Sequence, residues 1–267
     1  MPGTIRAFLK KCSVEAMPQY LIKPGGISGK QFLLEGAEAA HAALSARLRR
    51  GDSLKLFDGA GTKYLAVISD MSAGRVCGKI LESFVCPQPR AALELCFSAV
   101  SRAASETIIY ACTQLGADIF TPVVSERADK TLLKKWAARK DRFAALALSA
   151  CKQCERAFLP EIAGPAALAD ISPGQGEPVF MALERSDCGA SIEIMSRVFE
   201  GSPRKVRILT GPEGGFTAGE VEAAVKRGAL AFSLGPYILR AETACQSACA
   251  ILGALRNRQL DKQRFVR

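Results

Sequence analysis

Two glycine-rich turns, far apart along the chain, constrain its fold more than any other feature of the sequence. In the first, the apolar run 208–210 leads into the glycine-rich residues 211–215, and Thr217 and Glu220 have the spacing of a helix-capping box. In the second, an apolar run ends before Gly235 and Pro236, and a helix is predicted to begin near Arg240. Both turns have the order strand, turn, helix, which is typical of a parallel α/β sheet.

Each turn alone allows two interpretations. A glycine turn can simply connect a strand to a helix, or it can let a ligand approach the backbone closely. No Lys-Ser or Lys-Thr follows the glycines, and the G-x-G-x-x-G spacing is missing, so nucleotide-phosphate loops are excluded. Because ligands bind beyond the carboxyl ends of parallel strands, two such turns favour one shared pocket. Arg240, Glu242 and Thr243 would border it.

The chain is predicted to form two domains, residues 1–85 and 86–267. The first is β-rich, with expected strands at 6–9, 31–34, 53–57, 64–69 and 75–81 and one helix at about 37–48. The proline-containing segment 86–89 is typical of a linker. After it, expected strands at 92–100, 119–124, 178–183, 206–210 and 232–234 alternate with expected helices at 106–115, 129–158, 217–227 and 240–258. This alternation indicates a parallel sheet covered on both faces.

Positive charge is denser in the N-terminal part of the chain than in the rest. The formal net charge is +10, and residues 1–75 carry 11 Lys and Arg against 6 Asp and Glu. A basic module of this kind suits phosphate binding, but a solvated face has the same composition. The candidates for RNA contact are Arg6, Arg47, Arg49 and Arg50.

The ten cysteines and the single histidine do not predict a metal site. Cys151 and Cys154, like Cys245 and Cys249, fall in helix-like stretches that lack the turn glycines of a zinc knuckle. We expect free thiols in the core. The chain shows no signal peptide and no apolar run long enough to cross a bilayer, so a cytoplasmic protein without a metal is expected.

The residues of the two turns carry a family resemblance. Leu209-Thr210-Gly211-Pro212-Glu213-Gly214-Gly215-Phe216, followed by Leu234-Gly235-Pro236 and residues 238–244, resemble the paired signature of the RsmE family of 16S rRNA uridine-N3 methyltransferases, in the SPOUT superfamily. Weaker likenesses at 48–59, 115–127 and 150–162 extend the resemblance over nearly the whole chain.

The resemblance implies a fold and a chemistry. The fold is α/β, with a SPOUT-type parallel sheet and a deep C-terminal trefoil knot, plus a small N-terminal β-barrel domain that is PUA-like and binds RNA. The implied partners are a second copy of the chain and small-subunit ribosomal RNA in an assembled subunit. The implied reaction transfers a methyl group from S-adenosyl-L-methionine to N3 of a uridine.

The implied reaction suggests roles for the residues of the two turns. Arg240 is expected to stabilise negative charge on the base, Glu242 to accept a proton or orient Arg240, and Thr243 to position either. A water molecule is the alternative proton acceptor. The residues expected to contact the cofactor are Leu183, Glu184, Leu209, Thr210, Gly211, Pro212, Glu213, Gly214, Gly215, Leu234, Gly235, Ile238, Leu239, Arg240, Thr243 and Ala244.

The chain also departs from the family pattern at five positions: Tyr110, Ala111, Lys152, Glu155 and Tyr237. These departures concern RNA docking and target identity more than the cofactor loops. Two alternatives stay open, namely a SPOUT methyltransferase that acts on another RNA and a non-catalytic RNA-binding factor in ribosome assembly.

Overall fold

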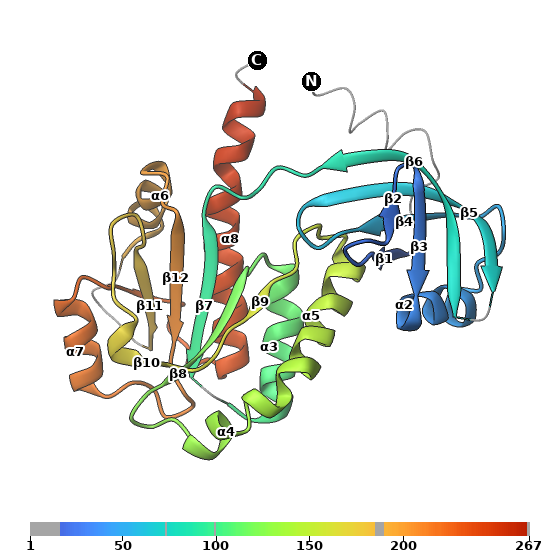
Figure 1. The fold of residues 1–267 in the computed structure, drawn as a ribbon. Coiled ribbons are helices and arrows are strands. Elements are labelled where there is room, and N and C mark those ends of the chain that lie inside the picture. The colour runs from blue at the N-terminus through green and yellow to red at the C-terminus, as the bar shows by residue number, and fades with distance from the viewer. Residues whose placement is uncertain (1–16, 73, 99, 185–189, 266–267) are drawn as a thin grey trace. The chain divides into compact units, whose positions relative to one another are not determined.

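The structure is a computed structural model of the 267-residue chain and describes residues 17–72, 74–98, 100–184 and 190–265. The chain forms two compact units (Figure 1). The first unit combines Met1–Gln88 with Cys151–Leu159, and the second combines Pro89–Ala150 with Pro160–Arg267. The sequence predicted a boundary between residues 85 and 86. It did not predict that Cys151–Leu159 would belong to the first unit. The expected strand at 6–9 lies outside the described residues.

The first unit is built on a six-stranded sheet in the order β1-β4-β5-β6-β3-β2. All neighbouring strands are antiparallel except β1 and β4. Alternation of the side chains buries Phe32 and Leu34 on one face of β3. The described strand pairs do not include the barrel closure that the resemblance implied. The strands are β1 (Gln19–Leu21), β2 (Ile27–Ser28), β3 (Gln31–Glu35), β4 (Ser53–Phe57), β5 (Thr62–Ser72) and β6 (Arg75–Val85).

One short helical segment interrupts these strands. Helix α2 (Gly36–Ala40) continues as a π-helical turn, η2 (His41–Ser45), so the helix ends earlier than the predicted residue 48. Arg47 then adopts a positive φ of 53°. The change of direction places the side chains of Arg47, Arg49 and Arg50 on an exposed loop.

The segment Cys151–Leu159 is joined to the first unit by charged contacts. Lys152 Nζ lies 3.0 Å from Glu38 Oε1, and Lys55 Nζ lies 2.6 Å from Glu155 Oε1. Glu155 has a positive φ of 56° and terminates the preceding helix. Lys152 and Glu155 are two of the positions where the chain departs from the family pattern, and each has an oppositely charged partner within this unit.

The second unit contains a seven-stranded parallel sheet in the order β10-β8-β7-β12-β11-β13, with β9 paired to β8. Every strand pair in it is parallel, as predicted. The strands are β7 (Ala92–Ser98), β8 (Ile119–Val124), β9 (Glu161–Ile162), β10 (Ala166–Ala167), β11 (Val179–Leu183), β12 (Lys205–Thr210) and β13 (Leu230–Ser233).

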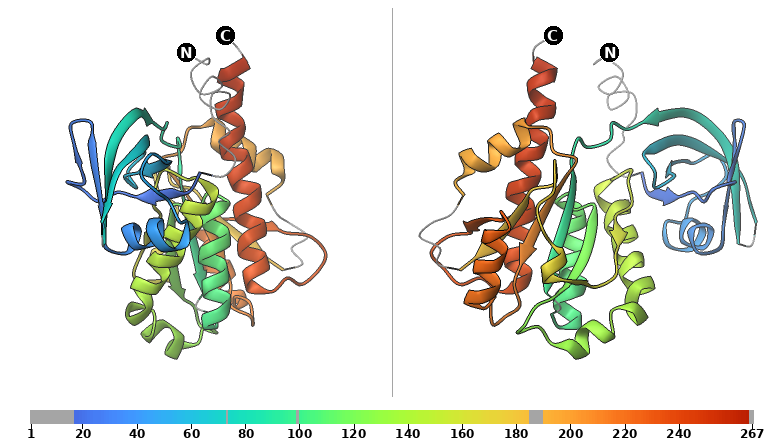
Figure 2. Two further views of the ribbon diagram at one scale, coloured as in Figure 1. Left: turned by 90° about the vertical axis from the view of Figure 1, so that its right-hand side faces the viewer. Right: turned by 60° about the vertical axis from the view of Figure 1, so that its left-hand side comes forward.

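Helices cover both faces of this sheet (Figures 1 and 2). Buried residues of α3, α5, α6 and α8 pack in one core with Phe97, Ile208 and Phe232. A second core, on the other face, joins Leu209 to Ala224 of α7. The helices are α3 (Arg102–Gln114), α4 (Lys130–Lys134), α5 (Lys140–Cys154), α6 (Ile192–Glu200), α7 (Ala218–Lys226) and α8 (Ala241–Phe265), with 3-10 turns η3 (Ala137–Arg139) and η4 (Leu168–Asp170).

Several boundaries differ from the prediction for local reasons. Helix α3 begins at Arg102 rather than 106 because the Ser101 hydroxyl accepts a hydrogen bond from the Ala104 amide and caps it. The predicted helix at 129–158 is divided into α4, η3 and α5. Helix α6, the strands β9 and β10, and the strands β1 and β2 of the first unit were not predicted. Among the described helices, none combines the length and apolarity required to cross a membrane.

A buried carboxylate ties together the three central strands of the second unit. Glu94 on β7 accepts hydrogen bonds from Thr121 on β8 at 2.7 Å and from Arg207 on β12 at 3.0 Å, and it lies 3.0 Å from Lys205 Nζ. Burial raises the pKa of Glu94, but the Thr121 hydrogen bond and the charges of Lys205 and Arg207 outweigh it. The net pKa is below the ordinary value.

Replacing Glu94 by glutamine is expected to destabilise this unit. Hydrogen bonds to charged groups contribute about 1.5–3 kcal/mol each, so we expect a loss of roughly 2–3 kcal/mol in the free energy of unfolding. Because the folded pKa is depressed, the stabilisation is present above the ordinary pKa and is lost as the pH falls through the folded value. Urea unfolding at pH 7 and pH 4 measures both effects. The matched control is Glu222→Gln, a change at an exposed glutamate. Equal urea midpoints for the two variants would show that the buried Glu94 carboxylate does not stabilise the unit.

Candidate active site

The first glycine turn follows strand β12, which ends at Thr210. The predicted capping box is present: Thr217 Oγ1 accepts from the Glu220 amide at 3.2 Å, and Glu220 accepts from the Thr217 amide at 2.8 Å. Gly215 has a positive φ of 67°, and no atom lies within 4 Å of the position a Cβ would occupy. The turn therefore exposes backbone where a side chain would otherwise stand.

The second glycine turn follows β13 and precedes α8. Gly235 has a φ of 124°, a conformation that strongly favours glycine, and again no atom lies within 4 Å of its Cβ position. The Ser233 hydroxyl lies 3.2 Å from the Gly235 amide and accepts its hydrogen bond. The chain then passes through Tyr237 and Ile238, which are 81% and 60% exposed, before α8 begins at Ala241.

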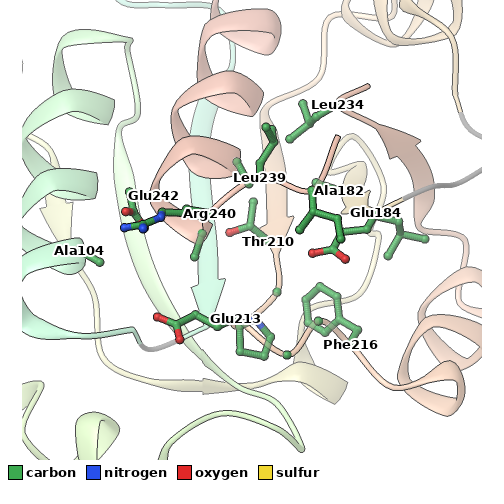
Figure 3. A pocket seen from close by; sticks show the side chains of 18 of the residues that line it. Ala104, Ala182, Glu184, Thr210, Glu213, Phe216, Leu234, Leu239, Arg240 and Glu242 are labelled. Atoms are coloured by element: carbon green, nitrogen blue, oxygen red, sulfur yellow. The ribbon is translucent and has the colours of Figure 1, made fainter. Parts of the chain in front are cut away.

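The sheet order brings the two turns together. Strands β12 and β13 both pair with β11, and parallel strands end at one edge of a sheet. At that edge lies a cavity of about 990 Å³. Figure 3 shows Thr210 near its middle, with Arg240 and Glu242 on one side and Ala182, Glu184 and Phe216 on the other.

Most of the predicted site residues line this cavity. They are Leu183, Glu184, Thr210, Gly211, Pro212, Glu213, Gly214, Gly215, Leu234, Gly235, Ile238, Leu239, Arg240, Glu242 and Ala244. Two predicted residues do not line it. Leu209 is fully buried in the core beneath α7, because alternation along β12 points it away from the helices of the opposite face. Thr243 is exposed on α8, turned away from Ala241 and Ala244, which face the cavity.

The cavity is also lined by residues that were not predicted from the sequence. They are Ser101, Ala103, Ala104, Thr107, Arg127, Phe216, Val221, Tyr237 and Ala241. Ala182, near the end of β11, also lines the cavity. Strands β7 and β8 end at the same edge as β12, so the segments after them also reach the cavity. Applying the strand-end rule to these two strands would have indicated residues 101–107 and Arg127.

A network of hydrogen bonds fixes the first glycine turn. Arg127 Nη1 donates to the Gly214 carbonyl at 2.7 Å, and Thr217 Oγ1 donates to Glu126 Oε2 at 3.1 Å. The Glu126 amide donates to Glu220 Oε1 at 2.7 Å. The loop after β8 therefore holds the turn at three points. A preorganised loop loses little entropy when a ligand binds.

The floor of the cavity is uncharged. Thr210 Oγ1 lies 3.2 Å from Cys245 Sγ in α8. Burial raises the pKa of the Cys245 thiol to about 12, so the sulfur is neutral near pH 7 and is a poor nucleophile. No group of three or more potential metal-ligating side chains is found within the described part of the chain. The charged groups available to chemistry at this site are Arg127, Glu184, Glu213, Arg240 and Glu242.

Comparison with known proteins agrees with this geometry. A family model described as an RNA methyltransferase domain matches residues 87–253, and one described as an RNA methyltransferase PUA domain matches residues 34–81. The parallel sheet, its cavity and the attached β-rich unit thus define an RNA methyltransferase with a PUA domain. More narrowly, a ribosomal RNA small subunit methyltransferase E is 30% identical to the chain and covered over 77% of its length, so the chain belongs to that family.

Relatives of this name match most of the chain. The protein from Synechocystis sp. is 30% identical over 238 residues, which cover 88% of this chain and 77% of that protein. The Mycobacterium bovis protein is 28% identical, with coverages of 86% and 89%.

Solved structures share the fold. The Neisseria gonorrhoeae ribosomal RNA small subunit methyltransferase E, bound to S-adenosyl methionine, has a TM-score of 0.76 at 24% identity and covers 90% of this chain and 98% of its own. A probable rRNA-methyltransferase from Porphyromonas gingivalis has a TM-score of 0.72 at 23% identity, with coverages of 91% and 100%.

Proposed function

We propose that this protein transfers a methyl group from S-adenosylmethionine to N3 of a uridine in 16S ribosomal RNA, acting on the assembled small subunit. The observation that carries the proposal is the single cavity that both glycine turns line, with Arg240 at its edge. Membership of the ribosomal RNA small subunit methyltransferase E family supports the choice of RNA. We also propose the C-terminal trefoil knot and the homodimer that the resemblance implies, and light scattering of the purified protein tests the dimer.

The residues of the cavity fit S-adenosylmethionine. Gly215 and Gly235 leave space beside exposed backbone, where adenine edges can be hydrogen-bonded. Leu183, Leu234 and Leu239 supply apolar walls. Glu184, Glu213 and Glu242 bring negative charge to a cavity that would receive a cation. When bound, the cofactor supplies an electrophilic methyl group on a sulfonium.

The protein's own residues then act on the uridine. N3 carries an imide proton that must leave before the nitrogen can attack. Arg240 is placed to stabilise the negative charge that spreads onto the base oxygens, as a preorganised cation does at a developing anion. Glu242, half-buried and on the same side of Thr210, accepts the N3 proton directly or holds Arg240 in place (Figure 3). Thr243 has no role in this proposal because its side chain is exposed outside the cavity.

The test is mass spectrometry of ribosomal RNA nucleosides from cells with and without the gene. We expect N3-methyluridine to disappear from 16S rRNA in the deletion strain and to return with the parent gene. Primer extension locates the nucleotide, because a methyl at N3 blocks Watson–Crick pairing. An unchanged 16S rRNA would overturn the proposal. A loss of methylation confined to transfer RNA would favour a different RNA substrate, and failure to bind S-adenosylmethionine in calorimetry would favour a non-catalytic assembly factor.

The loop carrying Arg47, Arg49 and Arg50 is proposed to bind phosphates. Arg6, the fourth predicted contact, lies outside the described residues. Changing Arg49 to glutamate is expected to weaken RNA binding by about tenfold and to reduce the slope of log K against log salt by about one to two. Filter binding over a range of salt concentrations measures both. Arg75→Glu makes the same charge change at an exposed site in the same unit and serves as control. Equal losses of RNA affinity in the two variants would mean that net charge, and not the position of Arg49, determines RNA binding.

A further inference from the structure

The cavity has a side that the cofactor loops do not account for. Figure 3 shows Arg240 and Glu242 extending toward Ala104 of α3, away from Ala182, Glu184 and Phe216. The wall on this side consists of Ser101, Ala103, Ala104 and Thr107, with Arg127 from the loop after β8. None of these residues belongs to either glycine turn.

The volume lies at the upper end of the range for a single small ligand, so the cavity is roomy. Pockets for a single drug-sized molecule run from about 300 to 1,000 Å³, and this one measures about 990 Å³. A methyl transfer requires donor and acceptor in one site, with the reacting atoms roughly 3–3.5 Å apart. The side walled by α3 therefore has the position and the room for an acceptor.

The wall formed by α3 suits a flat base. Ser101 uses its hydroxyl to cap the helix, and the buried Ser105 hydroxyl donates to the Val100 carbonyl, so both are engaged within the protein. What faces the cavity is mainly small: the methyl groups of Ala103 and Ala104. Small side chains leave open depth in which a base can lie after it has left its stack.

Arg127 connects the two sides of the cavity. Its Nη1 donates to the Gly214 carbonyl, and this is the one hydrogen bond the guanidinium makes among the described residues. The side chain is exposed, so its remaining donors face solvent at the cavity mouth. A guanidinium held by one nitrogen keeps its fork geometry and can bind a phosphate with the others.

We propose that the side of the cavity walled by α3 is the acceptor-nucleotide subsite. The uridine lies against Ala103 and Ala104, opposite Arg240 and Glu242, and Arg127 binds its phosphate while holding Gly214. Arg127 is thus proposed to contact the RNA directly while it holds the first glycine turn through Gly214. The inference rests on the proposed function and adds to it the residues that receive the RNA.

Filling the subsite tests its location. Ala103→Phe adds a ring on an exposed helical position and is expected to lower kcat/KM for small ribosomal subunits by about 100-fold, the effect of displacing an acceptor by about an ångström. The dissociation constant for S-adenosylmethionine, measured by calorimetry, should stay within about twofold of the parent's. Ala145→Phe, on the exposed face of α5 and outside the cavity lining, is the matched control and should behave as the parent.

Removing the cation tests the role of Arg127. Arg127→Met is expected to raise the KM for RNA by about tenfold and to reduce the salt slope of binding by about one. Arg127→Lys should recover part of the RNA affinity. Lys134→Met removes one charge from the exposed surface of α4 and should leave the KM unchanged.

The outcomes separate this inference from the proposed function. If the parent protein methylates RNA and Ala103→Phe retains its full kcat/KM, the subsite lies elsewhere and the proposal is overturned. If Ala103→Phe loses S-adenosylmethionine binding along with activity, the ring has entered the cofactor side and the assignment of the α3 wall is wrong. A parent that methylates no RNA would instead contradict the proposed function.

Discussion

Replacement of Arg240 by alanine is expected to lower kcat by about 10²–10³-fold while leaving the affinity for S-adenosylmethionine nearly unchanged. The guanidinium is proposed to act on charge that develops on the base during the reaction, so its loss falls on the transition state and not on cofactor binding. Single-turnover methylation with a radioactive methyl donor measures the rate, and calorimetry measures the affinity.

Arg227→Ala provides the control for this variant. Arg227 is exposed, stands at the end of α7 and does not line the cavity. The Arg227→Ala substitution removes the same charge from the same unit, so the methylation rate of this variant should equal that of the parent. A full rate in Arg240→Ala would remove this arginine from the mechanism. A loss of cofactor affinity that accounts for the whole effect would reassign it to cofactor binding.

Adding one methyl group at Gly235 is expected to weaken cofactor binding severely. With a φ of 124°, an alanine would force the backbone into a region that costs about 1–3 kcal/mol, or the loop would move to escape it. If the free loop relaxes to avoid this strain, binding must restore the strained conformation. That cost reduces affinity for S-adenosylmethionine by about 5- to 150-fold, since 1.4 kcal/mol corresponds to a tenfold change. The effect should appear in calorimetry before any RNA is added.

Gly219→Ala adds the same methyl group where the backbone is helical and the space is open. Because alanine has the higher helix propensity, this variant should gain about 0.5–1 kcal/mol in the free energy of unfolding and bind the cofactor normally. Equal cofactor affinities in the Gly235 and Gly219 variants would show that the second turn does not contact the ligand.

The strand-and-turn patterns predicted the local elements around the cavity because each signal is local. The apolar run before Gly211 and the spacing of Thr217 and Glu220 fix β12 and the start of α7, and the structure contains both. The parallel sheet then follows from the alternation of strands and helices. That β11 lies between β12 and β13, and so brings the two turns together, depends on long-range pairing that no short window of sequence contains.

The features that the sequence did not predict also depend on contacts between distant parts of the chain. Ser101 caps α3 through a single hydroxyl, and the predicted helix began four residues later because Arg102 to Ser105 carry no clear apolar period. Arg127 lines the cavity only because β7 and β8 join the edge that ends at Thr210. Thr243 was assigned to the site because it lies with Arg240 and Glu242 at the predicted start of a helix, but helical rotation turns its side chain outward. Tertiary placement, not local preference, decided each of these.

A crystal structure of the protein with S-adenosylmethionine would show directly whether the two glycine turns bind the donor. We expect the donor between Gly211–Gly215 and the loop at Gly235, with its sulfonium methyl directed toward Arg240 and the wall of α3. Density for the donor in any other part of the molecule, or a methyl group directed away from Arg240, would contradict it.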